Sequence, residues 1–391
     1  MSRMVQRDVV ISGIGLVSCL GVGLDAHRDA LRAPPGAPVV DTQRFAPFPV
    51  HPLPEIDWGQ QIPKRGDQRQ MENWQRLGVY AAGLALDDAG VKGDADFCGT
   101  MDMIVAAGGG ERDVEVDTAI MKMADQPDAG PAINEKLIND LRPTLFLAQL
   151  SNLLAGNISI VHGVTGSSRT FMGEESAGIS ALQTAVARLR SGQSTHVLVG
   201  AATHAEHPDF LLNYELGGHL HRGDWRPVWD RGTSEGGGVV AGGGGAFLVL
   251  ETREHAEARG RKPYAVLDRV VSDRLRRGDS HAKGLGALVE AAGAADRAFV
   301  VSGASGSPAA TQAERAALGD RPVRGQCSLI GHLREVQMPF AVALAALAVA
   351  DGIAAAPFTP DERPAGGPVD AVLATTVGFL RGDGAALVSK A

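Results

Sequence analysis

The segment GSSRTFMGEESAGISALQTAVARLRSGQSTHVLVG, residues 166–200, contains the pattern that decides the fold. Its order of elements is predicted to be a strand over 166–172, a sharp turn over 173–178, a helix over 179–190 and a strand over 195–200. The helix is amphipathic or buried, because its apolar residues recur at helical spacing; they are Ile179, Leu182, Val186 and Leu189. A strand, turn, helix and strand in succession are typical of an α/β protein.

The same alternation continues along the whole chain. Further short apolar runs predict buried strands at 9–11, 103–105, 247–250, 299–301, 371–373 and 385–388. Helices are predicted over 75–89 and 338–355, and the second is apolar on nearly every face. A helix of that kind lies between layers, so we predict an α/β fold with largely parallel sheets covered on both faces.

A polar, charged segment at residues 252–264 predicts a seam between two α/β halves. The stretch that follows it again begins and ends with strand-like residues. We therefore divide the chain into a larger half, residues 1–252, and a smaller half, residues 253–391. With 391 residues and 44% apolar side chains, the chain has enough material for a substantial core.

Charge and cysteine content exclude several classes of protein. The 37 basic and 45 acidic residues give a net charge of −8 without a basic stripe, so we expect no nucleic-acid partner. The longest apolar run, residues 338–350, is too short to span a bilayer, so we expect no membrane insertion. Widely spaced Cys19, Cys98 and Cys327 indicate free thiols. No signal-peptide pattern precedes the first strand, so we expect a cytoplasmic protein.

Three motifs that often bind cofactors or metals are incomplete here. GIGLVS, residues 13–18, lacks the third glycine of a dinucleotide site, and the glycine run at 236–245 lacks the lysine of a P-loop. Four neighbouring histidines have no cysteine or carboxylate that completes a recognised metal pattern; they are His204, His207, His219 and His221. We therefore expect no cofactor and no metal.

Glu174 and Glu175 lie between the end of a predicted strand and the start of a helix. Backbone N–H groups converge at such a position and the helix dipole is positive there, so it favours a carboxylate or a reactive thiolate. Two interpretations stay open from these residues alone. The acids form part of a functional site, or they only complement the dipole in the first turn of the helix.

Several collinear motifs resemble those of the β-ketoacyl-[acyl carrier protein] synthase family over essentially the whole chain. They are VVISGIGLVS at 9–18, NLLAGNISI at 152–160, RPVWD at 226–230, AFLVLE at 246–251, IGH at 330–332 and GAALV at 384–388. The resemblance implies a thiolase fold, in which two pseudo-equivalent α/β halves form a five-layer αβαβα sandwich. It also implies assembly as dimers, either with an active ketosynthase subunit or with a second copy.

The resemblance implies a degenerate catalytic site. Family members use a cysteine nucleophile and two histidines, with an oxyanion hole that binds the thioester oxygen. Here Glu175 occupies the cysteine position, Gly303 replaces the first histidine, and His332 retains the second. Two further substitutions are Cys327 for a lysine and Gly243 for a glutamate. The gating loop is altered to GFLRGD at 378–383, which contains Phe379.

A carboxylate is a weak nucleophile toward a thioester, so this pattern implies that independent condensation has been lost. EESAG at 174–178 is similar to a turn of the chain-length-factor subunits of type II polyketide systems. GDQRQM at 66–71 and TGSSR at 165–169 resemble synthase-like proteins assigned to very-long-chain acyl groups of lipid A. We expect a non-condensing subunit that pairs with an active ketosynthase and acts on acyl carrier protein.

In that expectation the Glu175 carboxylate accepts hydrogen bonds from the former oxyanion-hole N–H groups or bonds with His332, and Phe379 packs beside it. The strand near 169–172 would lie close to the dimer axis. Two alternatives are a malonyl-carrier-protein decarboxylase that uses Glu175 and His332, and a structural scaffold. Basic Lys64, Arg65 and Arg69 are candidates for docking acidic carrier protein, although Gly66 and Gln70 replace bases of the family.

Overall fold

The computed structural model describes residues 7–33, 36–233, 236–380 and 382–391. Its main sheet consists of two five-stranded groups, to which the short strand β2 (Gly21–Val22) is added beside β1. Among the described residues, strands of the two groups pair where β1 meets β9, through Val10↔Val266 and Ile11↔Ala265. A separate two-stranded sheet pairs β3 (Val50–His51) with β7 (Ala241–Gly242).

The two groups of strands have the same internal order. The first contains β1 (Val9–Ser18), β4 (Asp102–Ala106), β5 (Ser168–Phe171), β6 (His196–Thr203) and β8 (Gly244–Thr252). The second contains β9 (Ala265–Asp273), β10 (Phe299–Ser302), β11 (Val323–Gly325), β12 (Ala371–Val377) and β13 (Asp383–Ser389). In chain order within each group, the spatial sequence is third, second, fourth, fifth, first. The strands that pair in parallel and those that pair antiparallel also correspond.

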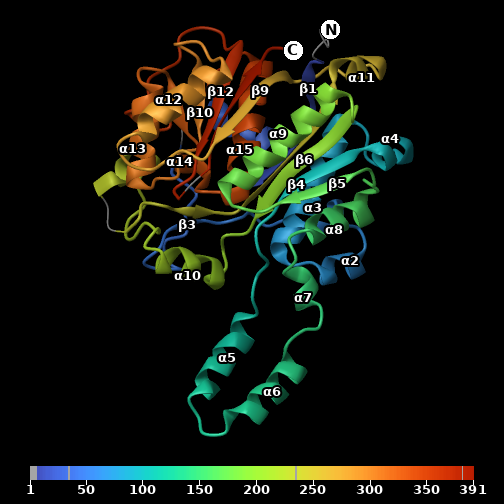
Figure 1. Ribbon diagram of the computed structural model, residues 1–391, viewed down its shortest axis with the longest axis vertical. Coiled ribbons are helices and arrows are strands. Elements are labelled where there is room, and N and C mark those ends of the chain that lie inside the picture. Colours follow the sequence, from blue (N-terminus) through green and yellow to red (C-terminus); the bar gives the residue numbers. More distant parts are fainter. Residues whose placement is uncertain (1–6, 34–35, 234–235, 381) are drawn as a thin grey trace.

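Helices separate and cover the two groups in layers (Figure 1). The central layer, α9 (Glu175–Ser191) and α15 (Gln337–Asp351), packs against strands of both groups. The outer face of the first group carries α3 (Asn73–Ala89) and α8 (Leu153–His162), and that of the second carries α12 (His281–Ala292) and α13 (Pro308–Leu318). The five-layer αβαβα sandwich expected from the sequence is therefore present. The boundary at residue 252 stays a prediction; β8 ends at Thr252.

The central helices differ slightly from their predicted bounds. Helix α15 is buried from Gln337 to Val349, as its apolar composition requires, but it ends at Asp351 because Gly352 takes a left-handed φ of 67°. Helix α9 begins at Glu175, so the predicted turn over 173–178 is shorter than expected. The chain reverses at Gly173 and Glu174, whose φ angles are 131° and 52°, and helix geometry starts at the next residue.

The remaining helices connect these layers or project from them. They are α1 (Gly23–Arg32), α2 (Arg65–Gln70), α4 (Ala95–Thr100), α5 (Val114–Ala124), α6 (Ala129–Asp140), α7 (Leu145–Ala148), α10 (Pro208–Leu216), α11 (Arg253–Ala258) and α14 (Cys327–Ile330). The described residues also contain three 3-10 helices, which are η1 (Trp58–Gln60), η2 (Val228–Thr233) and η3 (Arg334–Val336). Helices α5 and α6 form an arm that extends away from the body (Figure 1). Among the described residues, every helix is too short or too polar to cross a membrane.

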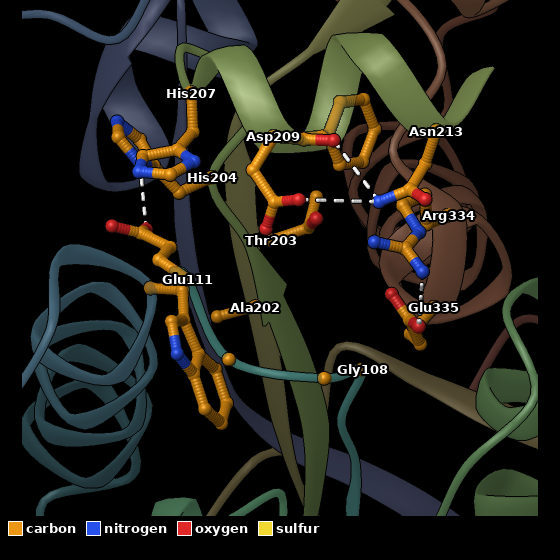
Figure 2. A pocket seen from close by; sticks show the side chains of 14 residues that line it. Gly108, Glu111, Ala202, Thr203, His204, His207, Asp209, Asn213, Arg334 and Glu335 are labelled. Carbon is orange, nitrogen blue, oxygen red and sulfur yellow. Dashed lines mark hydrogen bonds and ion pairs between the residues drawn. The ribbon is translucent and has the colours of Figure 1, made fainter. Parts of the chain in front are cut away.

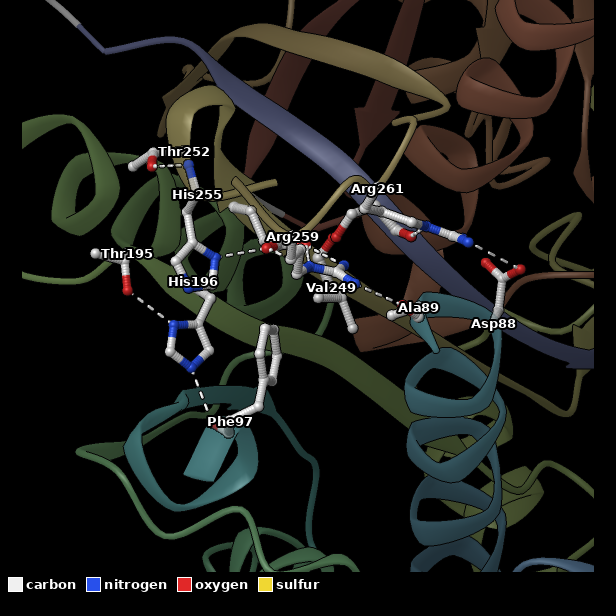
Figure 3. A network of polar contacts seen from close by, with 12 residues as sticks. Asp88, Ala89, Phe97, Thr195, His196, Val249, Thr252, His255, Arg259 and Arg261 are labelled. Carbon is white, nitrogen blue, oxygen red and sulfur yellow. Dashed lines mark hydrogen bonds and ion pairs between the residues drawn. The ribbon is translucent and has the colours of Figure 1, made fainter. Parts of the chain in front are cut away.

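A buried carboxylate ties α11 to the body on the side far from the arm (Figure 3). Glu251, at the end of β8, is fully buried and bonds with both Arg259 and His255. Arg259 also donates to the carbonyl of Ala89 at the end of α3, at 2.9 Å. Burial alone would raise the pKa of Glu251, but the hydrogen bonds, that from Arg259 foremost, outweigh burial and hold the pKa below its usual value.

Replacement of Glu251 by Gln should lower the free energy of unfolding by roughly 2–4 kcal/mol at pH 7, because the Arg259 charge loses its partner. The folded pKa lies below the unfolded pKa, so the carboxylate stabilises the fold above about pH 4.5 and loses this effect as the pH falls further. Urea denaturation at pH 7 and pH 4 checks both statements. Glu254→Gln, an exposed acid on the same helix, is the control and should cost under about 0.5 kcal/mol.

Candidate functional site

The start of α9 lies against η3 at a distance that only glycine permits. A Cβ atom on Gly178 would lie 2.1 Å from the carbonyl oxygen of Glu335, which is backbone and cannot move aside. This contact brings Glu175, in the first turn of α9, beside His332, which lies two residues before η3. Two segments that are distant in sequence are thereby joined at one site.

Glu175 and His332 form a buried pair. Oε1 of Glu175 accepts a hydrogen bond from Nε2 of His332 at 2.8 Å, and the backbone N–H of Phe379 approaches the same oxygen at 3.4 Å. Glu175 is 2% exposed and His332 is fully buried. The carboxylate therefore lies at the positive end of α9 with a histidine and a backbone donor, and water does not reach it.

Three aromatic rings cover this pair. The Phe379 ring meets the His332 ring edge-on at a centroid distance of 5.7 Å. Phe379 in turn packs on Tyr214 at 5.3 Å and on His219 at 4.6 Å. Burial raises the pKa of Tyr214 well above its usual value, so its hydroxyl stays protonated in the core. Phe379 thus lies beside Glu175 and contributes both a ring and an N–H group.

The guanidinium of Arg334 and its carboxylate neighbours lie next to the Glu175–His332 pair. Nη2 of Arg334 is 3.5 Å from Glu174 and 3.6 Å from Glu335. Burial would lower the pKa of Arg334, but the surrounding carboxylates outweigh burial and raise it. Burial raises the pKa of Glu174, and Arg334 opposes that change. Arg334 and Glu174 both have positive φ angles, 49° and 52°, which cost backbone energy and are typical of functional turns.

The backbone leaves no space for a side chain at Gly303. A Cβ atom there would lie 2.6 Å from the carbonyl oxygen of Thr375. The carbonyl of Gly303 accepts a hydrogen bond from Nε2 of Gln337, whose same nitrogen also lies 3.0 Å from the sulfur of Cys327. Burial raises the pKa of the Cys327 thiol to about 12. Cys327 is therefore a packed, protonated thiol.

The other residues selected from the sequence are not part of the cluster around Glu175 and His332. A Cβ atom on Gly243 would meet the side chain of Leu53 at 2.9 Å, so this position packs against a neighbouring loop. Lys64, Arg65 and Arg69 are exposed at α2, as a docking surface requires.

The four histidines do not converge on one point. His204 bonds with Glu111 at 2.8 Å, His219 packs on Phe379, and His221 bonds with the carbonyl of Asp224. No group of three or more His, Cys, Asp or Glu side chains in the described part of the chain is arranged to hold a metal ion.

Sequence reasoning missed several residues around the site. Arg334 and Glu335 follow His332 almost directly, and that proximity is a signal that could have identified them. Tyr214 gives no comparable signal, because an aromatic residue in an apolar helix is typical of any core. Its position depends on how α10 packs over the loop that contains Phe379.

The sequence model of the β-ketoacyl synthase N-terminal domain matches residues 6–256, more than half of the chain. The chain belongs to the β-ketoacyl synthase family. Relatives include 3-oxoacyl-[acyl-carrier-protein] synthase 2 of Vibrio harveyi, which is 26% identical over 274 residues. That match covers 68% of this chain and 62% of the Vibrio protein. The ketoacyl synthase beta subunit of the tetracenomycin polyketide synthase of Streptomyces glaucescens is 28% identical, over 88% of this chain and 86% of its own length.

Solved structures of β-ketoacyl synthases share the fold. The ishigamide ketosynthase/chain length factor superposes with a TM-score of 0.76 at 22% identity, over 99% of this chain and all of the other. A β-ketoacyl synthase from Burkholderia phymatum superposes with a TM-score of 0.76 at 21% identity, over 98% of this chain and all of the other. The thiolase fold expected from the sequence is confirmed. The roles of Glu175, Gly303, His332 and Phe379 stay predictions.

Glu175→Ala should lower the free energy of unfolding by roughly 2–4 kcal/mol, because two buried donors lose their acceptor and a cavity opens. Glu175→Gln retains an oxygen at the same place and should cost less than half as much. Urea denaturation of the full chain at pH 7 compares the two. Equal losses would contradict the assignment of Oε1 as the acceptor.

Native protein should resist thiol reagents. Burial raises the pKa values of Cys19 and Cys327 to about 12 and also raises that of Cys98, so thiolate is scarce at pH 8 and the sulfurs are covered. Intact-protein mass spectrometry after brief iodoacetamide treatment should find no adduct in buffer and three in guanidinium chloride. One thiol that reacts rapidly in the native chain would contradict this packing.

Proposed function

We propose that the chain is a non-condensing ketosynthase-like subunit that pairs with an active ketosynthase during acyl-chain elongation on acyl carrier protein. The observation that carries the proposal is the buried carboxylate of Glu175 against His332 and the Phe379 N–H group. Condensation requires a thiolate and an oxyanion hole that is free to receive the thioester oxygen. Here a carboxylate stands in place of the thiol, and its oxygen lies 3.4 Å from the backbone N–H group of Phe379, in the segment to which the resemblance assigns the gating loop.

The backbone at Gly303 supports the same conclusion. The resemblance implies that this position holds the first catalytic histidine in active members, and here Thr375 leaves no space for it. Even with a thiol at residue 175, the site would lack one of the two histidines that assist decarboxylation. Two independent features therefore oppose condensation.

The names of similar proteins and the surface of this chain support the existence of a partner subunit. The Streptomyces relative is a beta subunit, and a structural neighbour is a ketosynthase/chain length factor. Strand β5 is the last strand of its group, with no neighbour on its outer side among the described residues. Near it, Ile160 and Met172 are 70% and 64% exposed. An uncovered edge strand with exposed apolar side chains is typical of an assembly surface.

Co-expression of the full chain with a ketosynthase that retains its Cys-His-His set tests the proposal. We expect the two to purify as a 1:1 complex and to elongate malonyl units together, while this chain alone gives no condensation product. Glu175→Gln in the complex should retain activity within about twofold, because its carboxylate takes no part in bond formation. Replacement of the partner's cysteine should abolish the activity.

Glu175→Cys serves as a second arm. We expect no condensation from this variant alone, because Gly303 still supplies no histidine. Acyl elongation by the unaided wild-type chain, or by Glu175→Cys alone, would overturn the proposal. A homodimer that never binds the ketosynthase would favour a scaffold instead.

Because Glu175 contacts His332, a decarboxylase is the second candidate function. Such an enzyme would release CO₂ from malonyl carrier protein, with these two side chains around the thioester carbonyl. The carboxylate charge opposes it, since the enolate that forms is itself negative. CO₂ release that disappears in Glu175→Gln and His332→Ala would favour this candidate. The chain length of the elongated product would distinguish a polyketide from a very-long-chain lipid pathway.

A further inference from the structure

A small cavity of about 150 Å³ lies beside the Glu175 site, at the ends of β4 and β6 (Figure 2). Its walls are residues 108–110, the first turns of α10, and Arg334 and Glu335 of η3. Arg334 belongs to both places, because it faces Glu174 and also lines the cavity. Glu175 and His332 are not among the residues that line it.

Four polar atoms of the lining residues are buried and have no hydrogen-bond partner. They are Nε1 of Trp74, Nδ1 of His207, Nε of Arg334 and Oε1 of Glu335. Glu335 is 1% exposed and Trp74 is 4% exposed. The nearest cationic nitrogen to Glu335 Oε1, Nη2 of Arg334, lies 3.6 Å away, beyond hydrogen-bond distance. Buried polar groups are normally paired, so several unpaired atoms around one cavity indicate an occupant.

The donor or acceptor character of these atoms restricts the chemistry of the occupant. Trp74 and Arg334 offer N–H donors, whereas Glu335 offers an acceptor, so the occupant needs both an acceptor and a donor. An ammonium group has only donors and leaves the two N–H groups unpaired. A hydrocarbon chain leaves all four atoms unpaired.

Charge excludes an anion. The lining contains the carboxylates of Glu111, Asp209 and Glu335 against the single guanidinium of Arg334. Glu111 is paired with His204 at 2.8 Å, but the other two carboxylates would still repel a negative group. A neutral group that both donates and accepts hydrogen bonds is the remaining class.

We propose that this cavity binds a small neutral molecule that both donates and accepts hydrogen bonds, such as a primary amide, whose donor would meet Glu335 and whose acceptor would meet Trp74 or Arg334. A cavity of 150 Å³ is large enough for about six heavy atoms, by comparison with cavities that hold benzene. The proposal is independent of the role in elongation, because the amide would contact neither Glu175 nor His332. The test of ligand binding at this cavity is therefore separate from the test of the role in elongation.

Titration of the full chain with propionamide, propionate and propylammonium tests the proposal. The readout is the NMR signal of the Trp74 indole N–H, assigned among four tryptophans by Trp74→Phe. We expect a saturable shift with propionamide at a Kd of the order of millimolar, as suits a ligand of five heavy atoms. Propionate and propylammonium should bind at least tenfold more weakly.

Two variants locate the binding. Gly109 lines the cavity at an exposed position where a Cβ atom meets no atom within 4 Å, so Gly109→Leu should fold normally and, by covering the opening of the cavity, weaken propionamide at least tenfold. Gly286→Leu on α12, where a Cβ atom also meets nothing, is the matched control and should bind normally. Glu335→Gln, which keeps the size of the side chain, should weaken binding about tenfold.

Three results would overturn the proposal. They are the absence of a saturable shift with propionamide, equal binding of propionate or propylammonium, and unchanged binding in every folded variant of the pair Gly109→Leu and Glu335→Gln. The first would mean that ordered water alone occupies the cavity. Thermal unfolding of each variant verifies that it is folded, and the two variants act through different atoms, so loss of one still leaves a decisive measurement.

Discussion

The contact between α9 and η3 at Gly178 is the constraint on which the rest of the site depends. Any side chain at this position would push the helix away from the backbone of Glu335. The N-terminus of α9 would then no longer contact His332, and the turn at Glu174 would no longer be held in position. The same contact positions Arg334, so it determines the geometry of the small cavity as well as that of the carboxylate pair.

The carboxylate pair and its neighbours form one electrostatic unit. Three acids, Glu174, Glu175 and Glu335, surround a single guanidinium, that of Arg334, while His332 donates to one of them. Glu175 and Glu335 are buried, so little water screens their charges, whereas Glu174 and Arg334 are partly exposed. A new negative charge, whether a thiolate or an enolate, would enter a region that is already acidic. This electrostatic environment is the one on which the proposal of a non-condensing subunit rests.

Local periodicity predicted the alternation of strands and helices, whereas the five-layer arrangement was implied by the family resemblance. The prediction of largely parallel sheets was wrong, because β1 and β6 pair antiparallel with β8, and β9 and β12 pair antiparallel with β13. The apolar composition of α15 indicated its central position, and the short apolar runs located most strands. The start of α9 was predicted four residues late, at 179 instead of 175, because the sequence pattern does not show that Glu174 adopts a positive φ. The position of Glu175 beside His332 came from family resemblance. The aromatic cover by Tyr214 and the unpaired atoms around the cavity depend on long-range packing, which periodicity does not report.

The crowding at Gly303 affects how this chain could change over time. A single substitution that introduces histidine would drive its first side-chain atom into the carbonyl of Thr375, so the strand that carries residue 375 would have to move first. On the proposed assignment of these positions, a cysteine at residue 175 would gain no condensing activity before that movement had occurred. If the chain is the non-condensing subunit proposed above, a condensing site would therefore need changes at residues 175 and 303 together with a movement of the backbone at residue 375, and no single substitution would supply it.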